Sequence, residues 1–140
     1  MKNGDLTFKG EKLLFKLDQA SPTSGRIYES KLFIEAMDKA IKKTNSNPFG
    51  LLIVNKIYRK KTPKIKMQDT IGIVNDYNVL EDGTVLLDIC IYKDRIKEFN
   101  DLYDENTAFS PFSIGNIRHD KDSKIVDVLA IHHIHLVKMI

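Results

Sequence analysis

The stretch TIGIVNDYNVLEDGTVLLDICIY, residues Thr70 to Tyr92, carries the clearest structural signal in the chain. Two runs rich in apolar and β-branched residues, 70–80 and 84–92, flank the short sequence EDG at residues 81–83. Such runs predict strands, and glycine supplies the positive φ that a tight turn between antiparallel strands requires. The stretch therefore predicts an antiparallel hairpin.

Apolar spacing predicts two helices and further strands on either side of this hairpin. Residues 30–44 carry apolar side chains at helical spacing, and a second helix is expected from its N-cap, Asp94, to Tyr103. Further strands are expected over Lys12–Leu17, Phe49–Tyr58, Phe112–Arg118 and Lys124–Val137, the last two joined by the polar turn HDKDS. Strands outnumber helices without a βαβ rhythm. The pattern favours an α+β fold: a strongly curved, barrel-like, mainly antiparallel sheet with two helices.

The size and composition of the chain indicate one compact domain. It has 140 residues, of which 42% are hydrophobic, so residues 1–140 are expected to form a single core. No apolar run is long enough to span a bilayer, and the first residues lack the apolar segment of a signal peptide. The single cysteine, Cys90, excludes an internal disulfide. The chain is expected to be an intracellular protein that does not contact membranes.

Basic residues gather in one stretch between two of the predicted strands. Its members are Lys56, Arg59, Lys60, Lys61, Lys64 and Lys66, with Tyr58 among them. Such a stretch can contact a phosphate backbone or an acidic protein surface, and it can equally be a solvated loop. The mild net charge of +3 and the lack of a nucleic-acid motif count against a dedicated nucleic-acid binder. Partner binding by Lys56 to Lys61 remains a hypothesis.

Histidines near the C-terminus form the sequence HHIH. On a regular strand, residues two apart share a face, so His133 and His135 face one side and His132 the other. Two ligands do not make a zinc site, and His119 lies across a turn without a carboxylate to complete one. No metal is expected. The glycine-rich phosphate and dinucleotide motifs are absent as well, so no cofactor is expected.

A nucleophilic serine site is the other chemical candidate. In AFSPFSIGN, Ser110 or Ser113 could act as the nucleophile, with His119, His133 or His135 as the base. Serine beside glycine is common in turns, so spacing alone favours a structural role.

Several weak motifs follow one another in an informative order. SPTSGRIYESKLFIEAMDKAIKK is followed by NPFGLLIVN, the hairpin, AFSPFSIGNI and finally KIVDVLAIHHIHLVK. In this order they resemble the N-G-R-I-Y-P stretch and helix, the G-E-L-D-H-P motif, the hairpin, the G-I-S-S-R-G-x-G-S-V strand and the closing strand of tailed-phage prohead proteases. These serine proteases share their fold with herpesvirus assemblin. The resemblance runs from about Leu6 to Val137 and implies the same fold here.

The catalytic positions of that family are altered in this chain. Aligning GLLIVN, residues 50–55, on G-E-L-D-H-P puts Val54 where the family has its catalytic histidine. Ser110 matches the first serine of the serine motif, Pro111 the second, and Phe112 replaces the arginine. Valine cannot accept a proton, and proline lacks the N–H that an oxyanion hole could use. The resemblance therefore implies a catalytically inactive member, although His133 or His135 could correspond to the second histidine that assemblin-type sites carry on a late strand.

Three functional hypotheses follow. The first is a non-enzymatic phage structural protein, an auxiliary or decoration component that binds the major capsid protein and other virion proteins and could self-associate. It would reside in the virion, and in the host cytoplasm during assembly. The alternative is an active prohead-maturation serine protease that cleaves scaffold and capsid proteins, with Ser110, His133 and His135 as its site. The third is an intracellular binding module for nucleic acid or an acidic protein.

Overall fold

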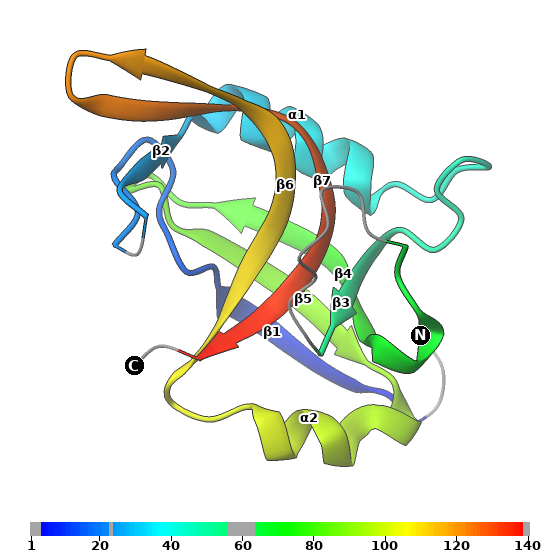
Figure 1. Cartoon of the computed structure of the whole chain (residues 1–140). Coiled ribbons are helices and arrows are strands. Elements are labelled where there is room, and N and C mark those ends of the chain that lie inside the picture. Colours follow the sequence, from blue (N-terminus) through cyan, green and yellow to red (C-terminus); the bar gives the residue numbers. More distant parts are fainter. Residues whose placement is uncertain (1–3, 23, 56–63, 139–140) are drawn as a thin grey trace.

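A computed structural model describes residues 4–22, 24–55 and 64–138 (Figure 1). Its elements, in chain order, are β1 (Leu6–Lys12), β2 (Arg26–Tyr28), α1 (Ser30–Ile41), β3 (Leu51–Val54), the 3₁₀ helix η1 (Met67–Asp69), β4 (Thr70–Val79), β5 (Val85–Ile91), the 3₁₀ helix η2 (Lys93–Arg95), α2 (Ile96–Leu102), β6 (Thr107–Asp120) and β7 (Ser123–Lys138). No helix in these ranges is both long and apolar enough to cross a bilayer.

The strands form one mixed sheet in the order β1-β5-β4-β3-β7-β2, with β6 pairing with β7. Along the part β1-β5-β4-β3 of this order, each strand is antiparallel to its neighbour. Strands β6 and β7 are antiparallel as well. Strand β7 runs parallel to both β2 and β3. The long, bent β7 therefore joins the first part of the chain to the last, and a sheet-dominated fold with two helices is confirmed (Figure 1).

The hairpin predicted from Thr70 to Tyr92 is present as β4 and β5. The two strands pair in antiparallel register from Gly72 opposite Ile91 to Val79 opposite Val85. At the turn, Gly83 has a φ of 89° and Leu80 N donates to Thr84 O at 2.8 Å. Gly83 thus has the positive φ that the sequence predicted for the turn.

The sheet is not closed into a barrel, which corrects the expectation from sequence. Between β1 and β6 the described chain forms a single bridge, Leu13 opposite Phe109, in place of a ladder. Aromatic rings occupy the gap: Phe8 lies 5.4 Å from Phe99, and Tyr103 lies 6.0 Å from Phe109, between ring centroids. Paired strands lie only about 4.8 Å apart, so these side chains pack where a ladder would have to form.

The strand predicted over Lys12–Leu17 is also wrong, because β1 ends at Lys12. Leu13, Phe15 and Leu17 do alternate into the core, which is the pattern that suggested a strand. Their backbone bonds, however, go to different strands: Leu13 N donates to Val85 O, and Leu14 N to Phe109 O. The segment crosses between β5 and β6 instead of extending one ladder.

Helix α1 packs on the sheet against β7 through one apolar face. Its buried side chains include Phe33 and Met37, which are fully buried in the core. The side chain of Ser30 does not cap the helix; instead Ser30 N donates to Asp18 Oδ1 at 2.9 Å. A carboxylate from an earlier loop therefore satisfies a free N–H at the helix start, where the dipole favours negative charge.

The remaining expected elements are present with shifted bounds. Asp94 does not cap α2, since it lies within η2 and the N-cap position is Arg95. Strand β3 covers only Leu51–Val54 of the predicted 49–58, and residues 56–58 lie outside the described residues. Strands β6 and β7 are confirmed and are longer than predicted.

Candidate functional site

Three neighbouring strands bring the candidate residues into one line across the sheet. Val54 of β3 is the register partner of His135 of β7, and His135 is also the partner of Ser110 of β6. Directly paired residues project from the same face of a sheet. We call this line of Val54, His135 and Ser110 the cross-strand row. The side chains next along, Ile53 and Ile134, belong to the core, so the row lies on the opposite face.

The row is largely closed to solvent and lacks a proton acceptor on its β3 side. Val54 is fully buried, His135 is 8% exposed and Ser110 is half-buried. A valine side chain neither donates nor accepts a hydrogen bond. The imidazole of His135 therefore has a serine on one side and hydrocarbon on the other.

His135 is held as a neutral imidazole. Its Nδ1 is buried and has no hydrogen-bond partner among the described residues, and burial lowers its pKa. Desolvation disfavours the charged form of histidine, which explains the direction. No hydrogen bond joins Ser110 Oγ to His135 within the described chain, although the two residues are paired directly.

His133 is fully buried beside the row and stacks on an aromatic ring. It pairs with Phe112, with ring centroids 4.9 Å apart and an interplanar angle of 16°. Burial, together with the neighbouring imidazoles of His132 and His135, lowers the pKa of His133 to about 3. His133 is therefore neutral at physiological pH.

The expectation that His132 points away from the other histidines is wrong. Between the pairs Phe112–His133 and Ser113–Ile131, β7 contains one extra residue, His132. This β-bulge breaks the two-residue alternation, and His132 Nδ1 lies 2.9 Å from His133 Nδ1. The three imidazoles gather, yet no group of three or more His, Cys, Asp or Glu side chains in the described ranges is arranged to hold a metal ion. That zinc is not bound stays a prediction.

Pro111 sits where its missing N–H costs the sheet nothing. Leu14 N donates to Phe109 O at 2.8 Å, so the backbone of Phe109 points away from β7. Backbone groups alternate in direction along a strand, and the backbone nitrogen of Pro111 therefore points away from β7 as well. The residue after Ser110 consequently supplies no amide hydrogen to an oxyanion hole.

Other residues considered from the sequence are not brought to the row. Ser113 lies on the other face of β6 by alternation, and His119 is exposed near the far end of that strand, paired with Lys124. The proposed partner-binding residues Lys56, Tyr58, Arg59, Lys60 and Lys61 lie outside the described residues, so their role stays a prediction.

Sequence reasoning missed a polar cluster beside the end of β3. Asn55 Nδ2 donates to Glu98 Oε2 at 2.6 Å, and Arg95 Nη1 donates to Glu98 Oε1 at 3.1 Å. Asn55 follows Val54 directly, so the cluster ties the end of β3 to α2. No local pattern signals it, because Asn55 lies 43 positions before Glu98 in the chain.

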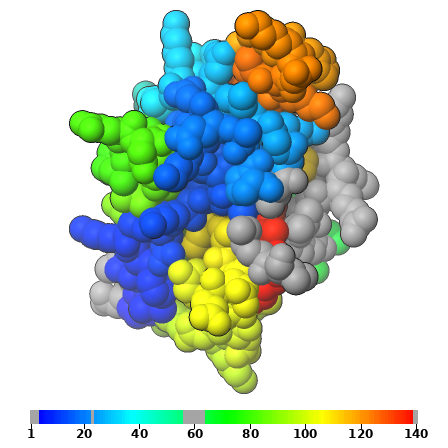
Figure 2. All heavy atoms as spheres, turned by 90° about the vertical axis from the view of Figure 1, so that its left-hand side faces the viewer, coloured from blue at the N-terminus to red at the C-terminus, as the bar shows by residue number. Residues whose placement is uncertain are grey.

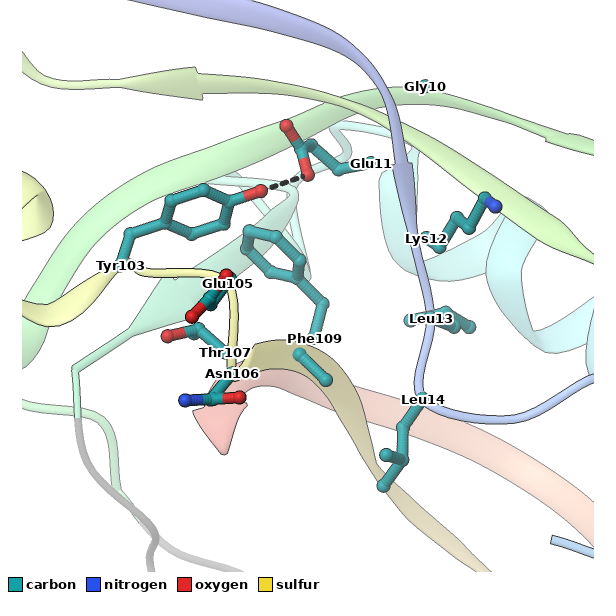
Figure 3. Close-up of a pocket in the computed structure, with 11 residues that line it drawn as sticks. Gly10, Glu11, Lys12, Leu13, Leu14, Tyr103, Glu105, Asn106, Thr107 and Phe109 are labelled. Carbon is teal, nitrogen blue, oxygen red and sulfur yellow. Dashed lines mark hydrogen bonds between the residues drawn. The ribbon is translucent and has the colours of Figure 1, made fainter. Parts of the chain in front are cut away.

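A separate open cavity of about 480 Å³ lies where β1 and the start of β6 diverge (Figure 3). Tyr103 and Glu11 face each other there, and the phenol donates to Glu11 Oε2 at 2.7 Å. Burial, and then the bond to Glu11, raises the pKa of Tyr103 to about 12. None of the residues of the cross-strand row lines this cavity, so it is a distinct feature of the open seam.

Comparison with known proteins bears on the fold. No protein-family model and no curated protein matches the chain. Among solved structures, it is similar to the bacteriophage T4 capsid assembly protease, gp21, with a TM-score of 0.70 at 9% sequence identity. The chain has the fold of a phage capsid assembly protease. The match covers 96% of this chain and 95% of the T4 protein, so the expected prohead-protease-like fold is confirmed as a fold. An identity of 9% leaves activity and partners to be proposed.

Proposed function

We propose that the chain is a non-enzymatic phage structural protein, an auxiliary capsid component that binds the major capsid protein. The fold likeness to the T4 capsid assembly protease supports the assembly context. The proposed inactivity rests on one observation. Val54, which is fully buried, lies beside the Ser110–His135 pair at the position where the family resemblance places the catalytic histidine.

The loss at this position is large in energetic terms. A positioned general base contributes roughly 10²–10⁴ in rate, and a valine contributes none of it. Losing one oxyanion donor costs about 3–4 kcal/mol of transition-state stabilisation, and Pro111 cannot supply a donor. These two changes support a protein that keeps the protease-like fold but acts through contacts at its surface.

The protease alternative also has a specific observation in its favour. Ser110 and His135 are direct cross-strand partners, and the buried Nδ1 of His135 is open to a hydrogen bond. A neutral imidazole next to a serine is the arrangement from which a base can remove the hydroxyl proton. A serine–histidine pair without a third member is therefore the second candidate.

Reaction with a serine-directed fluorophosphonate probe separates these two functions. The purified protein should label no more than its Ser110→Ala variant, because the hydroxyl of Ser110 lacks an effective base. Trypsin in the same reaction confirms that the probe is active. Labelling that maps to Ser110 or Ser113 would establish the protease and refute the structural role.

Capsid association tests the positive part of the proposal. The chain, co-expressed with the major capsid protein encoded in the same genome, should co-purify with assembled particles, and Ser110→Ala should leave assembly and protein processing unchanged. Replacing Lys56, Tyr58 and Arg59 together with alanine should weaken association, because a few anchors usually carry most of an interface energy. Absence of the chain from particles would contradict the capsid role.

A further inference from the structure

The far part of β6 is a strand with one unpaired edge. It pairs with β7 on one side, and its residues from Gly115 to Asp120 are exposed. Figure 1 shows this part of the hairpin, which we call the β6–β7 arm (residues 113–131), at the upper left of the molecule, where β2 pairs with Lys124–Val126 of its β7 strand. Figure 2 shows its outer end standing at the surface. Within the described chain β2 covers the β7 edge of the arm, and no strand pairs with its β6 edge. An edge of this kind presents backbone N–H and C=O groups to a further strand.

Backbone N–H and C=O groups alternate in direction along a strand, which identifies the residues of β6 whose backbone groups face this edge. The carbonyl of Phe109 accepts from Leu14 N, so Phe109 faces away from β7. Both register shifts in the β6–β7 ladder place the extra residue in β7, which leaves the alternation along β6 unbroken. The edge-facing residues of the arm are therefore Ser113, Gly115, Ile117 and His119.

The usual protection of an exposed edge is weak here. Proteins block such edges with proline, lysine or unpaired charges that point into the approaching strand. In β6 the proline, Pro111, comes before the arm. The cation of the arm strand, Arg118, is already held by carboxylates: its Nε lies 3.0 Å from Asp127 Oδ2, and its Nη2 pairs with Glu29.

Ile117 is an exposed apolar residue at this edge. It is 42% exposed, whereas its partner across the ladder, Val126, is 5% exposed. Paired residues share a face, so the apolar row that starts in the core at Val126 ends in solvent at Ile117. A strand added to the edge with an apolar residue opposite Ile117 would continue that row.

We propose that two copies of the chain pair through this edge of β6, antiparallel, about a two-fold axis at Ile117. In this register Ile117 lies opposite the same residue of the second copy, Gly115 lies opposite His119, and Asn116 lies opposite Arg118. The first two pairs join edge-facing residues, which exchange both N–H···O bonds in an antiparallel ladder. A two-fold interface must be self-complementary, and this edge meets that condition.

Charge selects this register, and the match of Ile117 with its own copy favours a second chain as the occupant. With the axis at Ile117, each Arg118, whose guanidinium pairs with Asp127 and Glu29 of its own chain, lies opposite the uncharged Asn116 of the other copy. Moving the axis to Arg118 would place two guanidinium groups directly opposite each other, which is destabilising. Moving it to Asn116 would separate the two isoleucines. In this register the strand thus sets each cation opposite an uncharged residue and each isoleucine opposite an isoleucine.

Sedimentation velocity over a range of protein concentrations tests the dimer. The parent chain should show a reversible monomer–dimer equilibrium. Ile117→Lys should weaken the dimer at least about ten-fold, because it places two ammonium groups at the axis. Leu129→Lys is the matched control: Leu129 is 62% exposed and lies in the same arm, but on β7 and away from the edge. Circular dichroism verifies that both variants fold.

A cysteine trap tests the register directly. Residues in a hydrogen-bonded antiparallel pair have Cα atoms about 5.5 Å apart, within the range of roughly 4.4–6.8 Å that a disulfide spans. With oxidised glutathione, Ile117→Cys should form a covalent dimer at least ten-fold faster than Leu129→Cys, and the parent, whose Cys90 is buried, should form none.

Three outcomes would overturn the proposal: a chain that stays monomeric at its highest soluble concentration, a dimer that both lysine variants weaken equally, or equal trapping at positions 117 and 129. A monomer that binds a capsid protein through Ile117 would assign the edge to that protein instead. None of these outcomes depends on whether Ser110 is reactive.

Discussion

At His133, burial rather than a charged partner sets the protonation state, and this makes stability depend on pH. The unfolded chain takes up a proton at the ordinary pKa of 6.5, whereas the folded chain stays neutral at this position down to about pH 3. Between these values the unfolded state binds more protons, so the free energy of unfolding falls as the pH falls. The stabilisation is fully present above pH 6.5 and is lost progressively on acidification.

This dependence gives a prediction for His133→Asn, which keeps a hydrogen-bonding atom near the Nδ1 position. Removing one depressed histidine should reduce the slope of unfolding free energy against pH by up to about 1.4 kcal/mol per pH unit between pH 7 and about pH 5. Urea unfolding at several pH values measures the slope. An unaltered slope in His133→Asn would show that His133 already titrates in the folded state.

At the scale of elements, the β4–β5 turn depends on a glycine for two separate reasons. Gly83 has a φ of 89°, and a Cβ added to it would lie 2.5 Å from Leu17 O. The same turn accepts a backbone bond from Leu17 N to Gly83 O at 2.8 Å. A side chain would therefore strain the turn and also push away the segment that crosses between β5 and β6.

Gly10 offers a matched comparison for this prediction. It also has a positive φ, 76°, but a Cβ there would meet nothing within 4 Å. Gly10→Ala should therefore lower the free energy of unfolding by about 1–2 kcal/mol, the cost of a left-handed conformation in a residue with a side chain. Gly83→Ala should lower it distinctly more. Chemical denaturation of the two variants measures the difference. Equal losses would mean that the contact with Leu17 relaxes freely.

At the scale of the whole molecule, aromatic side chains replace the missing strand pairing of the open seam. Phe99 is fully buried and lies 5.4 Å from Phe8 and 5.0 Å from Tyr103, between ring centroids. It comes from α2 and Phe8 from β1, and Tyr103 also contacts Phe109 of β6, so the cluster couples the two sides of the seam. The seam is thus part of the core.

Phe99→Ala should accordingly lower the stability of the whole chain by about 3–5 kcal/mol, the usual cost of removing a buried phenylalanine. Unfolding should remain a single transition, as expected for one domain. Phe49→Ala, at an exposed position, is the control and should change stability by less than about 0.5 kcal/mol. Calorimetry on the three proteins measures both quantities. Two separate transitions in the parent would show that the chain is not one cooperative unit.

The candidate site could be predicted only in part. Ser110, His133 and His135 were identified because serine and histidine are chemically distinctive and occur in short motifs. The position of Val54 relative to them followed from a family resemblance, and the β3–β7–β6 register then placed it beside His135. The gathering of His132 with His133 was not predictable, because a bulge in β7 breaks the alternation on which the prediction relied.

The sequence by itself determined the features that near neighbours encode. The β4–β5 hairpin follows from two apolar runs and one glycine, α1 from apolar spacing, and the β6–β7 hairpin from two runs and a polar turn. Only the tertiary structure decided the parallel pairing of β7 with β2 and β3, the open seam beside Phe109 and the free edge at Ile117. The physical reason is that turn and periodicity signals act over a few residues. Strand partners far apart in the chain are chosen by packing, which no local pattern records.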